Sequence, residues 1–254
     1  MRKLVGLLVG LAVLAVGGTA IAGPAATNSN GDFLDLNLAV TPPVSSTAHT
    51  PHGVGLVFNE ISGNRVNANN ETANTSIVVR FNQNFTDNGL RFPACTINTK
   101  ALSQCSKASQ VGSGTAEGQL LSSGGKPPTY VPATVKIYNG KPYKGKAPTQ
   151  IYIASVSGKP EVELDFRITR VAGGLDFTEL QFPGATAGPP IYLTKFAFKV
   201  GDRSEMHKVK GKKVRIHLFN APTSCHGAWT YTQTLLYAKL PPLIATASQP
   251  CVKG

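Results

Sequence analysis

Apolar and polar residues alternate along most of this chain. The clearest case is the segment 161–171, in which each apolar side chain is followed by a charged or polar one: Val162, Leu164, Phe166 and Ile168. Successive side chains of a β-strand point to opposite faces, so this pattern predicts an antiparallel strand with one buried face and one solvated face. The same reasoning predicts strands at 34–40, 54–59, 76–82, 133–138, 150–156, 196–200, 214–218 and 229–237.

Turn-forming residues are frequent between these segments. The 254 residues include 26 Gly and 18 Pro, and only 15% of the chain is charged. A helical bundle or coiled coil would instead be rich in Ala, Glu, Lys and Leu. We therefore predict an all-β fold, an antiparallel β-sandwich of about 10–12 strands that is immunoglobulin-like or jelly-roll-like. No linker or fixed repeat divides the sequence, so residues 32–254 are expected to form a single domain.

The first 22 residues have the pattern of a secretory signal peptide. A short basic start is followed by the apolar run 4–16 and by small residues that end at Ala20 and Ala22. The apolar run is short of the roughly 20 residues that span a bilayer, which disfavours an uncleaved anchor helix. We expect cleavage after Ala22, a flexible leader at 23–31, and a secreted or extracellular protein that can associate with the cell surface.

Four cysteines remain after export, and their spacing favours disulfides over a zinc site. They are Cys95, Cys105, Cys225 and Cys251. An even number in an exported chain indicates a disulfide framework, whereas zinc ligands come in pairs about two to four residues apart. Of the possible pairings, the clustering favours Cys95–Cys105 and Cys225–Cys251. The loop-entropy model assigns these bonds about 2.7 and 3.5 kcal/mol of stabilisation.

Cysteine, proline and glycine recur in a distinctive order after residue 90. The segments are Phe92-Pro93-Ala94-Cys95, then Cys105, Ser109-Gln110-Val111-Gly112-Ser113-Gly114, Tyr138-Asn139-Gly140, Ala221-Pro222-Thr223-Ser224-Cys225, Trp229 and Pro250-Cys251. This order resembles secreted proteins of unknown function from high-GC Gram-positive bacteria. The resemblance implies a disulfide-pinned β-sandwich with no assigned activity, and it supplies no catalytic residue. One departure is Cys105-Ser106, where that family usually has Cys-Pro.

Motifs of known catalytic and metal sites are incomplete. Gly112-Ser113-Gly114 does not match the Gly-x-Ser-x-Gly elbow of serine hydrolases. The segment 123–126 is formally Ser-x-x-Lys, but it lacks the partner motifs and its two glycines disfavour a helix. His49 and His52 would need a third ligand to hold a metal, and the Pro and Gly beside them favour an exposed loop. We therefore expect no catalytic residue, no cofactor and no metal ligand.

Carboxylates provide the one enzymatic alternative. Glu161, Glu163 and Asp165 are two residues apart, so they share one face of a predicted strand. Glycoside hydrolases use two carboxylates, which leaves a carbohydrate-active or other hydrolytic enzyme as an alternative. Catalytic sandwiches of this kind usually have a concave face rich in Trp, however, and the chain has one Trp. An alternating solvated face is the simpler interpretation.

Positive charge is the remaining feature, with 25 Lys and Arg against 13 Asp and Glu and a formal net charge of +12. The cations concentrate in the segment 195–215 and, beside Tyr138 and Tyr143, in the segment 136–146. We predict that the loop 208–213 is exposed. The candidate residues for contact with an anionic partner are Lys208, Lys210, Lys212, Lys213 and Arg215. The expected partner is an anionic envelope polymer or polysaccharide, since nucleic acid is not expected outside the cytoplasm.

The sequence therefore favours a secreted, non-catalytic protein that serves as a binding or structural module at the cell envelope. Two alternatives stay open for its basic surface. The same loops would also suit anionic lipid at a membrane surface, and a positive net charge can simply keep a secreted protein soluble.

The export hypothesis predicts the mature N-terminus. N-terminal sequencing of the protein recovered from culture medium should begin at Gly23, because signal peptidase cleaves after a small-x-small motif. An extracellular product that retains Met1 would contradict this prediction.

Overall fold

The computed structural model describes residues 25–42, 52–67, 75–82, 85–95, 105–120, 127–157, 159–180, 191–222, 225 and 227–251. These residues form an all-β fold with antiparallel strand pairs, which confirms the predicted class. The strands are β1 (Ala26–Thr27), β2 (Asp32–Thr41), β3 (Gly53–Asn64), β4 (Ser76–Asn82), β5 (Thr86–Asp87), β6 (Gln110–Leu120), β7 (Thr129–Tyr143), β8 (Ala147–Val156), β9 (Lys159–Val171), β10 (Gly174–Glu179), β11 (Ile191–Val200), β12 (Ser204–Val209), β13 (Lys212–His217), β14 (Phe219–Asn220), β15 (Ala228–Leu236) and β16 (Leu243–Pro250). Two short 3-10 helices, η2 (Gly89–Arg91) and η3 (Lys107–Ser109), lie between strands. The predicted signal peptide lies outside the described residues.

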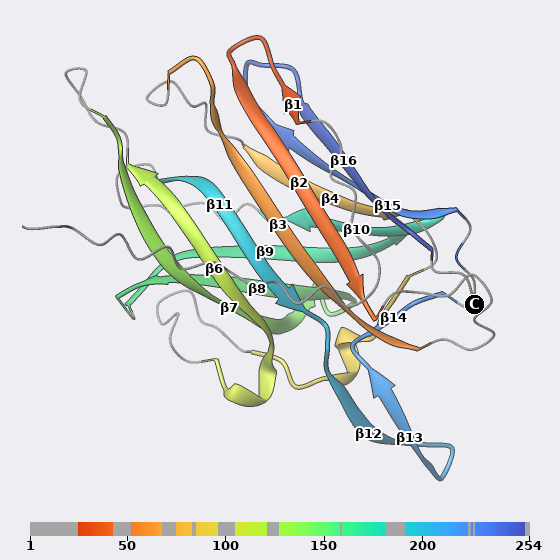
Figure 1. Ribbon diagram of the computed structural model, residues 1–254. Helices are drawn as coiled ribbons and strands as arrows, with labels where there is room; N and C mark the ends of the chain where they lie inside the picture. The colour runs from red at the N-terminus through yellow and green to blue at the C-terminus, as the bar shows by residue number, and fades with distance from the viewer. Residues whose placement is uncertain are drawn as a thin grey trace, which may run out of the picture.

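Most strands belong to one continuous sheet, in the order β1-β2-β3-β11-β6-β7-β8-β9-β10-β4-β15-β16. The sheet curls until its two ends approach each other (Figure 1). There the side chain of the buried Gln249 in β16 takes the place of a neighbouring strand and hydrogen-bonds with the backbone of β2. Its Oε1 accepts a hydrogen bond from Val40 N at 2.6 Å, and its Nε2 donates to Val40 O at 3.3 Å.

The result is a nearly closed barrel, and the expected pair of facing sheets is not what the strand order shows. The reason lies in the information that alternation carries. It identifies the buried face of each strand, but strands that face each other across a core can belong to one sheet or to two.

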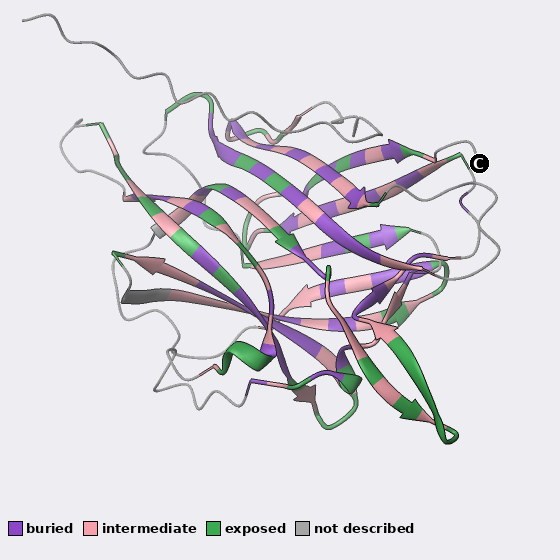
Figure 2. Ribbon diagram, turned by 60° about the horizontal axis from the view of Figure 1, so that its bottom comes forward, coloured by how far each residue is buried: buried purple, intermediate pink, exposed green. Residues whose placement is uncertain are grey.

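The buried positions largely follow the predicted alternation (Figure 2). In β9, for example, Phe166 and Ile168 are buried while Arg167 between them is partly exposed. Two predicted segments differ. β3 continues to Asn64, five residues past the predicted end, and this extension places Glu60 in the buried register. The predicted strand 214–218 is mostly β13, which pairs with β12 outside the barrel, so Val214 is exposed rather than buried.

Part of the segment that we expected to be a flexible leader is ordered. Ala26 and Thr27 form β1 and pair with β2. Just after them, the Asn28 side chain accepts hydrogen bonds from the backbone N–H groups of Asn30 and Asp32, at 2.9 and 3.1 Å. Polar composition suggested mobility here, but asparagine side chains can also organise a turn by bonding to the backbone.

The glycines of the Gly-x-Gly motif have a structural role in β6. Gly112 and Gly114 pair with Val200 and Phe198 of β11 and face the barrel interior with them. A Cβ added to Gly114 would lie 2.0 Å from the carbonyl oxygen of Ala197, and one added to Gly112 would lie 2.4 Å from that of Lys199. The backbone of β11 therefore crosses β6 too closely for any side chain at these positions.

Both predicted disulfides are confirmed. The Cα atoms are 5.0 Å apart in Cys95–Cys105 and 5.8 Å apart in Cys225–Cys251. The first disulfide lies on the outer face of β7 and β8, where it packs with Tyr138, Ile151 and Ile153 to form a small outer cluster. It thus fastens the segment after η2 to the outside of the barrel.

Asn139, from the Tyr138-Asn139-Gly140 motif, holds the same segment in place. It is buried, and its Nδ2 donates to the carbonyl oxygens of Gly89, Phe92 and Pro93 at 2.9, 3.2 and 3.2 Å. Its own carbonyl oxygen accepts from Cys95 N at 2.7 Å. A single asparagine thereby satisfies backbone groups of a segment that has no strand partner over most of its length.

The close approach of β11 to β6 predicts the effect of a single methyl group. Gly114→Ala should lower the free energy of unfolding by about 2 to 3 kcal/mol, because the backbone of β11 must move to admit the Cβ. The matched control is Ser113→Ala, whose side chain is exposed on the outer face of the same strand. Urea denaturation of both variants would measure the difference, and equal stabilities would contradict the proposed contact.

Candidate functional site

The predicted basic loop is the tip of a two-stranded hairpin that projects from one end of the barrel (Figure 1). β12 and β13 pair from Ser204↔His217 to Val209↔Lys212, and they are joined by Lys210 and Gly211. Both turn residues have positive φ, 48° and 82°. A two-residue turn of this kind matches the twist of a β-hairpin, so the basic segment is a regular structure rather than a loose loop.

All five candidate cations of this hairpin are exposed. Lys208 and Lys213 are directly opposite each other, and Arg215 follows on the same face, where its Nη1 donates to Ser204 Oγ at 3.0 Å. Lys210 is in the turn, and Lys212 is on the other face. Within the described part of the chain, none of the five lies within 4.0 Å of a carboxylate oxygen.

The neighbouring cations are neutralised in contrast. Lys195 pairs with Glu117 at 2.9 Å and Lys199 with Asp202 at 2.8 Å. Arg203 pairs with Glu205, the one acidic residue of the hairpin. Like charges in directly opposite positions of a hairpin are destabilising. The tip of the hairpin therefore accumulates positive charge that the described structure does not compensate.

The base of the hairpin is fixed to the barrel. Arg203 donates from Nη1 to Gln110 O at 2.8 Å, and its guanidinium lies over the ring of Phe92 at 5.9 Å from the centroid. The ring of His207 packs edge-on against the same Phe92, with the ring centroids 6.0 Å apart. These contacts give the projecting charges a defined direction.

The second basic group, around the β7–β8 turn, is arranged differently from the expectation. Two cations contact the ring of Tyr143, with Lys144 Nζ 5.3 Å and the Arg167 guanidinium 5.5 Å from its centroid. Tyr138, which we expected beside these cations, is buried in the outer cluster under the Cys95–Cys105 disulfide. It is therefore not available as a stacking surface.

The carboxylate alternative reduces to two residues. Glu163 and Asp165 lie on the outer face of β9, opposite Ile153 and Ile151 of β8. Partial burial raises the pKa of both groups, and the nearby Glu163 raises the pKa of Asp165 further, to about 7. The side chain of Glu161 lies outside the described residues. The pair faces away from the barrel interior.

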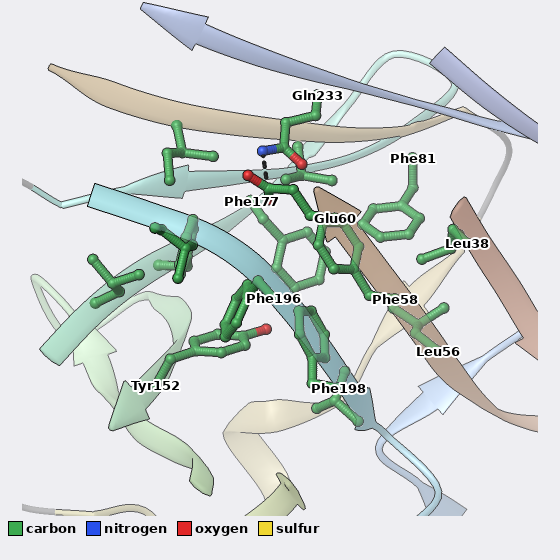
Figure 3. Close-up of a pocket in the computed structure, with 16 residues that line it drawn as sticks. Leu38, Leu56, Phe58, Glu60, Phe81, Tyr152, Phe177, Phe196, Phe198 and Gln233 are labelled. Atoms are coloured by element: carbon green, nitrogen blue, oxygen red, sulfur yellow. Dashed lines mark hydrogen bonds between the residues drawn. The ribbon is translucent and has the colours of Figure 1, made fainter. Parts of the chain in front are cut away.

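The barrel contains an internal cavity, which the sequence patterns did not predict. It lies between strands on opposite walls and leaves about 40 Å³ for the centres of water-sized molecules. Aromatic side chains form much of its surface (Figure 3): Phe58, Tyr152, Phe177, Phe196 and Phe198. The rings of Phe58 and Phe198 stack with their centroids 4.7 Å apart.

Two polar side chains interrupt this apolar surface. Glu60 of β3 and Gln233 of β15 are 5% and 1% exposed, and Gln233 Nε2 donates to Glu60 Oε2 at 3.0 Å. Burial raises the pKa of Glu60 to about 7, although hydrogen bonds from Gln233 and Ser62 favour its charged form. The other polar atom of the amide, Gln233 Oε1, has no hydrogen-bond partner in the part of the chain that the structure describes.

The sequence contains a signal for this pair. Glu60 has the same parity as Val54, Leu56 and Phe58, and Gln233 has the same parity as Trp229 and Tyr231. A polar residue in the buried register of a strand points to a buried polar site. Because the predicted strand ended at residue 59, Glu60 was not recognised as a buried residue.

Comparisons with known proteins give no relative: no family model, no curated protein and no solved structure matches the chain. Among the described residues, no helix is long and apolar enough to cross a membrane. The same residues contain no group of three or more His, Cys, Asp or Glu side chains that could hold a metal ion.

The raised pKa of Glu60 predicts a pH-dependent difference in stability. The folded state holds the proton up to about pH 7, whereas the unfolded chain releases it near 4.5. Glu60 therefore destabilises the fold increasingly as the pH rises between these values. Glu60→Gln should be more stable than the wild type by about 3 kcal/mol well above pH 7, and this advantage should vanish below about pH 4.5.

Urea denaturation at both pH values would measure the effect. Glu117→Gln is the control, because it removes a partly exposed carboxylate and its surface ion pair, which contributes little to stability. A Glu60→Gln advantage that does not change with pH would contradict the assignment.

Proposed function

We propose that the chain is a secreted, non-catalytic binding protein that contacts an anionic polymer of the cell envelope through the β12–β13 hairpin. The observation that carries the proposal is the uncompensated charge of five exposed cations on a hairpin with a fixed base. Two disulfides in the described structure are compatible with an extracellular location.

A regular hairpin presents these cations more effectively than a mobile tail. A mobile tail loses conformational entropy when it binds, whereas Lys208, Lys213 and Arg215 are already aligned on one face by strand pairing. Exposed charge costs little folding stability, and it attracts a polyanion over a distance set by the ionic strength.

Anionic lipid is the second candidate, and two exposed apolar side chains favour it. Met206 is 54% exposed and Val214 is 43% exposed, on opposite faces of the hairpin. The tip itself is Lys210-Gly211, however, and a charged tip disfavours insertion into hydrocarbon. An extended polymer can contact both faces of the hairpin without burying this tip.

The proposal predicts salt-dependent binding that depends on the position of the lysines. Replacement of Lys208, Lys210, Lys212 and Lys213 by Gln should weaken binding to polygalacturonate at low ionic strength by about tenfold or more. The melting temperature should change little, because exposed charges contribute little to folding. Titrations at several salt concentrations would also show a shallower dependence of log K on log salt in the variant.

The matched control carries the same charge change elsewhere, with Lys136, Lys141, Lys144 and Lys146 replaced by Gln. An equal loss in both variants, or no loss in either, would contradict the hairpin as the binding site. Binding to vesicles of equal parts phosphatidylglycerol and phosphatidylcholine, without binding to the polymer, would favour the lipid candidate instead.

A further inference from the structure

The barrel interior is filled at one end and open in the middle. At the end from which the hairpin projects, aromatic side chains close the core. Phe85 packs edge-on against Trp229 with centroids 5.6 Å apart, and against Phe219 at 5.4 Å. Side chains just fill a barrel of about eight strands, and larger barrels leave internal space. This sheet has more strands than that, which explains why a cavity remains beyond the aromatic residues Phe85, Phe219 and Trp229.

The strand registers place the partly exposed rim of the cavity at the opposite end. Ile77, Leu164 and Leu193 line the cavity and are only half-buried. They lie in the first halves of β4, β9 and β11, which run in the same direction in the barrel. The described residues thus leave the cavity an approach at this end, away from the basic hairpin.

Among the described residues that line the cavity, Gln233 has a buried acceptor atom without a hydrogen-bond partner. Gln233 uses its Nε2 to bind Glu60, which leaves Oε1 unpartnered in an almost fully buried side chain. Figure 3 shows Glu60 and Gln233 at the edge of the space enclosed by the aromatic rings. The other polar group of the lining, the Tyr152 hydroxyl, already donates to Gln150 Oε1 at 2.8 Å. A buried polar atom without a partner costs about 1 to 3 kcal/mol, and a ligand that donates a hydrogen bond would recover this loss.

We propose that the barrel interior binds a small, uncharged, apolar molecule with one hydroxyl group, which donates a hydrogen bond to Gln233 Oε1. Its hydrocarbon part would lie against Phe58, Phe196 and Phe198, which line the same cavity. A largely apolar pocket with a single oriented polar group is the usual form of a small-molecule site. This site is separate from the polymer contact of the hairpin and does not depend on it.

Size and charge limit the class of ligand. The cavity offers roughly three to four times the space that one water molecule needs, so a slim chain fits better than a bulky ring system. An anion would approach the carboxyl group of Glu60, and a charged group of either sign would lose its hydration in an apolar cavity. A neutral alcohol avoids both costs.

Methyl NMR tests the proposal directly, with 1-hexanol as the probe and its methyl ether as the analogue that cannot donate. In protein labelled at Ile, Leu and Val methyl groups, 1-hexanol should shift the signals of Leu56, Leu164 and Leu193. The signals of Ile151 and Ile153, in the outer cluster, should stay in place. The ether should bind about tenfold more weakly, because it leaves Oε1 unpartnered.

Two variants separate the hydroxyl contact from simple filling of the cavity. Gln233→Leu should lower the affinity for 1-hexanol to that for the ether and leave the ether nearly unchanged. Leu193→Trp, at the half-buried rim, should block both ligands, whereas Ile61→Trp on the exposed face of β3 should block neither. The alcohol-to-ether ratio in the wild type tests the hydroxyl contact even if Gln233→Leu does not fold.

Several outcomes would overturn the proposal. Cavity methyl signals that do not shift at saturating 1-hexanol would show that the interior takes up no such ligand. Equal shifts in the outer cluster would show nonspecific partitioning. Equal affinities for alcohol and ether would remove the hydroxyl contact, and Gln233 Oε1 would then be served by water alone.

Discussion

The structure depends on the curvature of a single sheet, which must turn far enough for its last strand to meet its second. Strands with large inward side chains cannot come close enough to each other for a sheet to curve this strongly. In β6 the inward positions are Gly112 and Gly114, and the backbone of β11 occupies the space that side chains would need. The turn is completed at β16, where Gln249 supplies through its side chain the donor and acceptor that Val40 lacks from a backbone neighbour.

This curvature also determines what the interior can hold. Because Gly112 and Gly114 of β6 add no side chain, Phe196 and Phe198 of the adjacent β11 reach past that strand to the ring of Tyr152 in β8, with centroids 5.9 and 5.2 Å apart. The aromatic residues near the hairpin end fill the barrel there, but the same closure leaves a space around Glu60 and Gln233. A carboxyl group in such a place is retained at a cost in stability, whereas five exposed lysine and arginine side chains cost little. The interior pair therefore carries a cost in stability that the hairpin cations do not.

Local patterns in the sequence predict the strands well and predict their assembly less well. Alternation correctly identified the buried faces of β2 and β9, and cysteine spacing gave both disulfides. The choice between barrel and sandwich depends on which strands become neighbours, such as β4 and β15, which are about 150 residues apart in sequence. Period-two alternation contains no information on such pairs. The predicted burial of Val214 was wrong for the same reason. Its strand alternates as expected, but it pairs with β12 outside the barrel and packs on no core.

The two proposed sites should respond to solution conditions independently. Roughly 20 Å of β3 separate Glu60 from the end of the barrel at which the hairpin begins, at about 3.3 Å per residue. Salt at physiological concentration screens charges in solvent over about 8 Å, and it is burial rather than a distant charge that raises the pKa of Glu60. Added salt would therefore weaken contact of the hairpin with a polyanion and leave uptake of a neutral molecule by the barrel unchanged. A rise in pH through 7 would instead weaken uptake of the neutral molecule and leave contact of the hairpin unchanged. It ionises Glu60 beside the cavity but leaves the lysines of the hairpin charged.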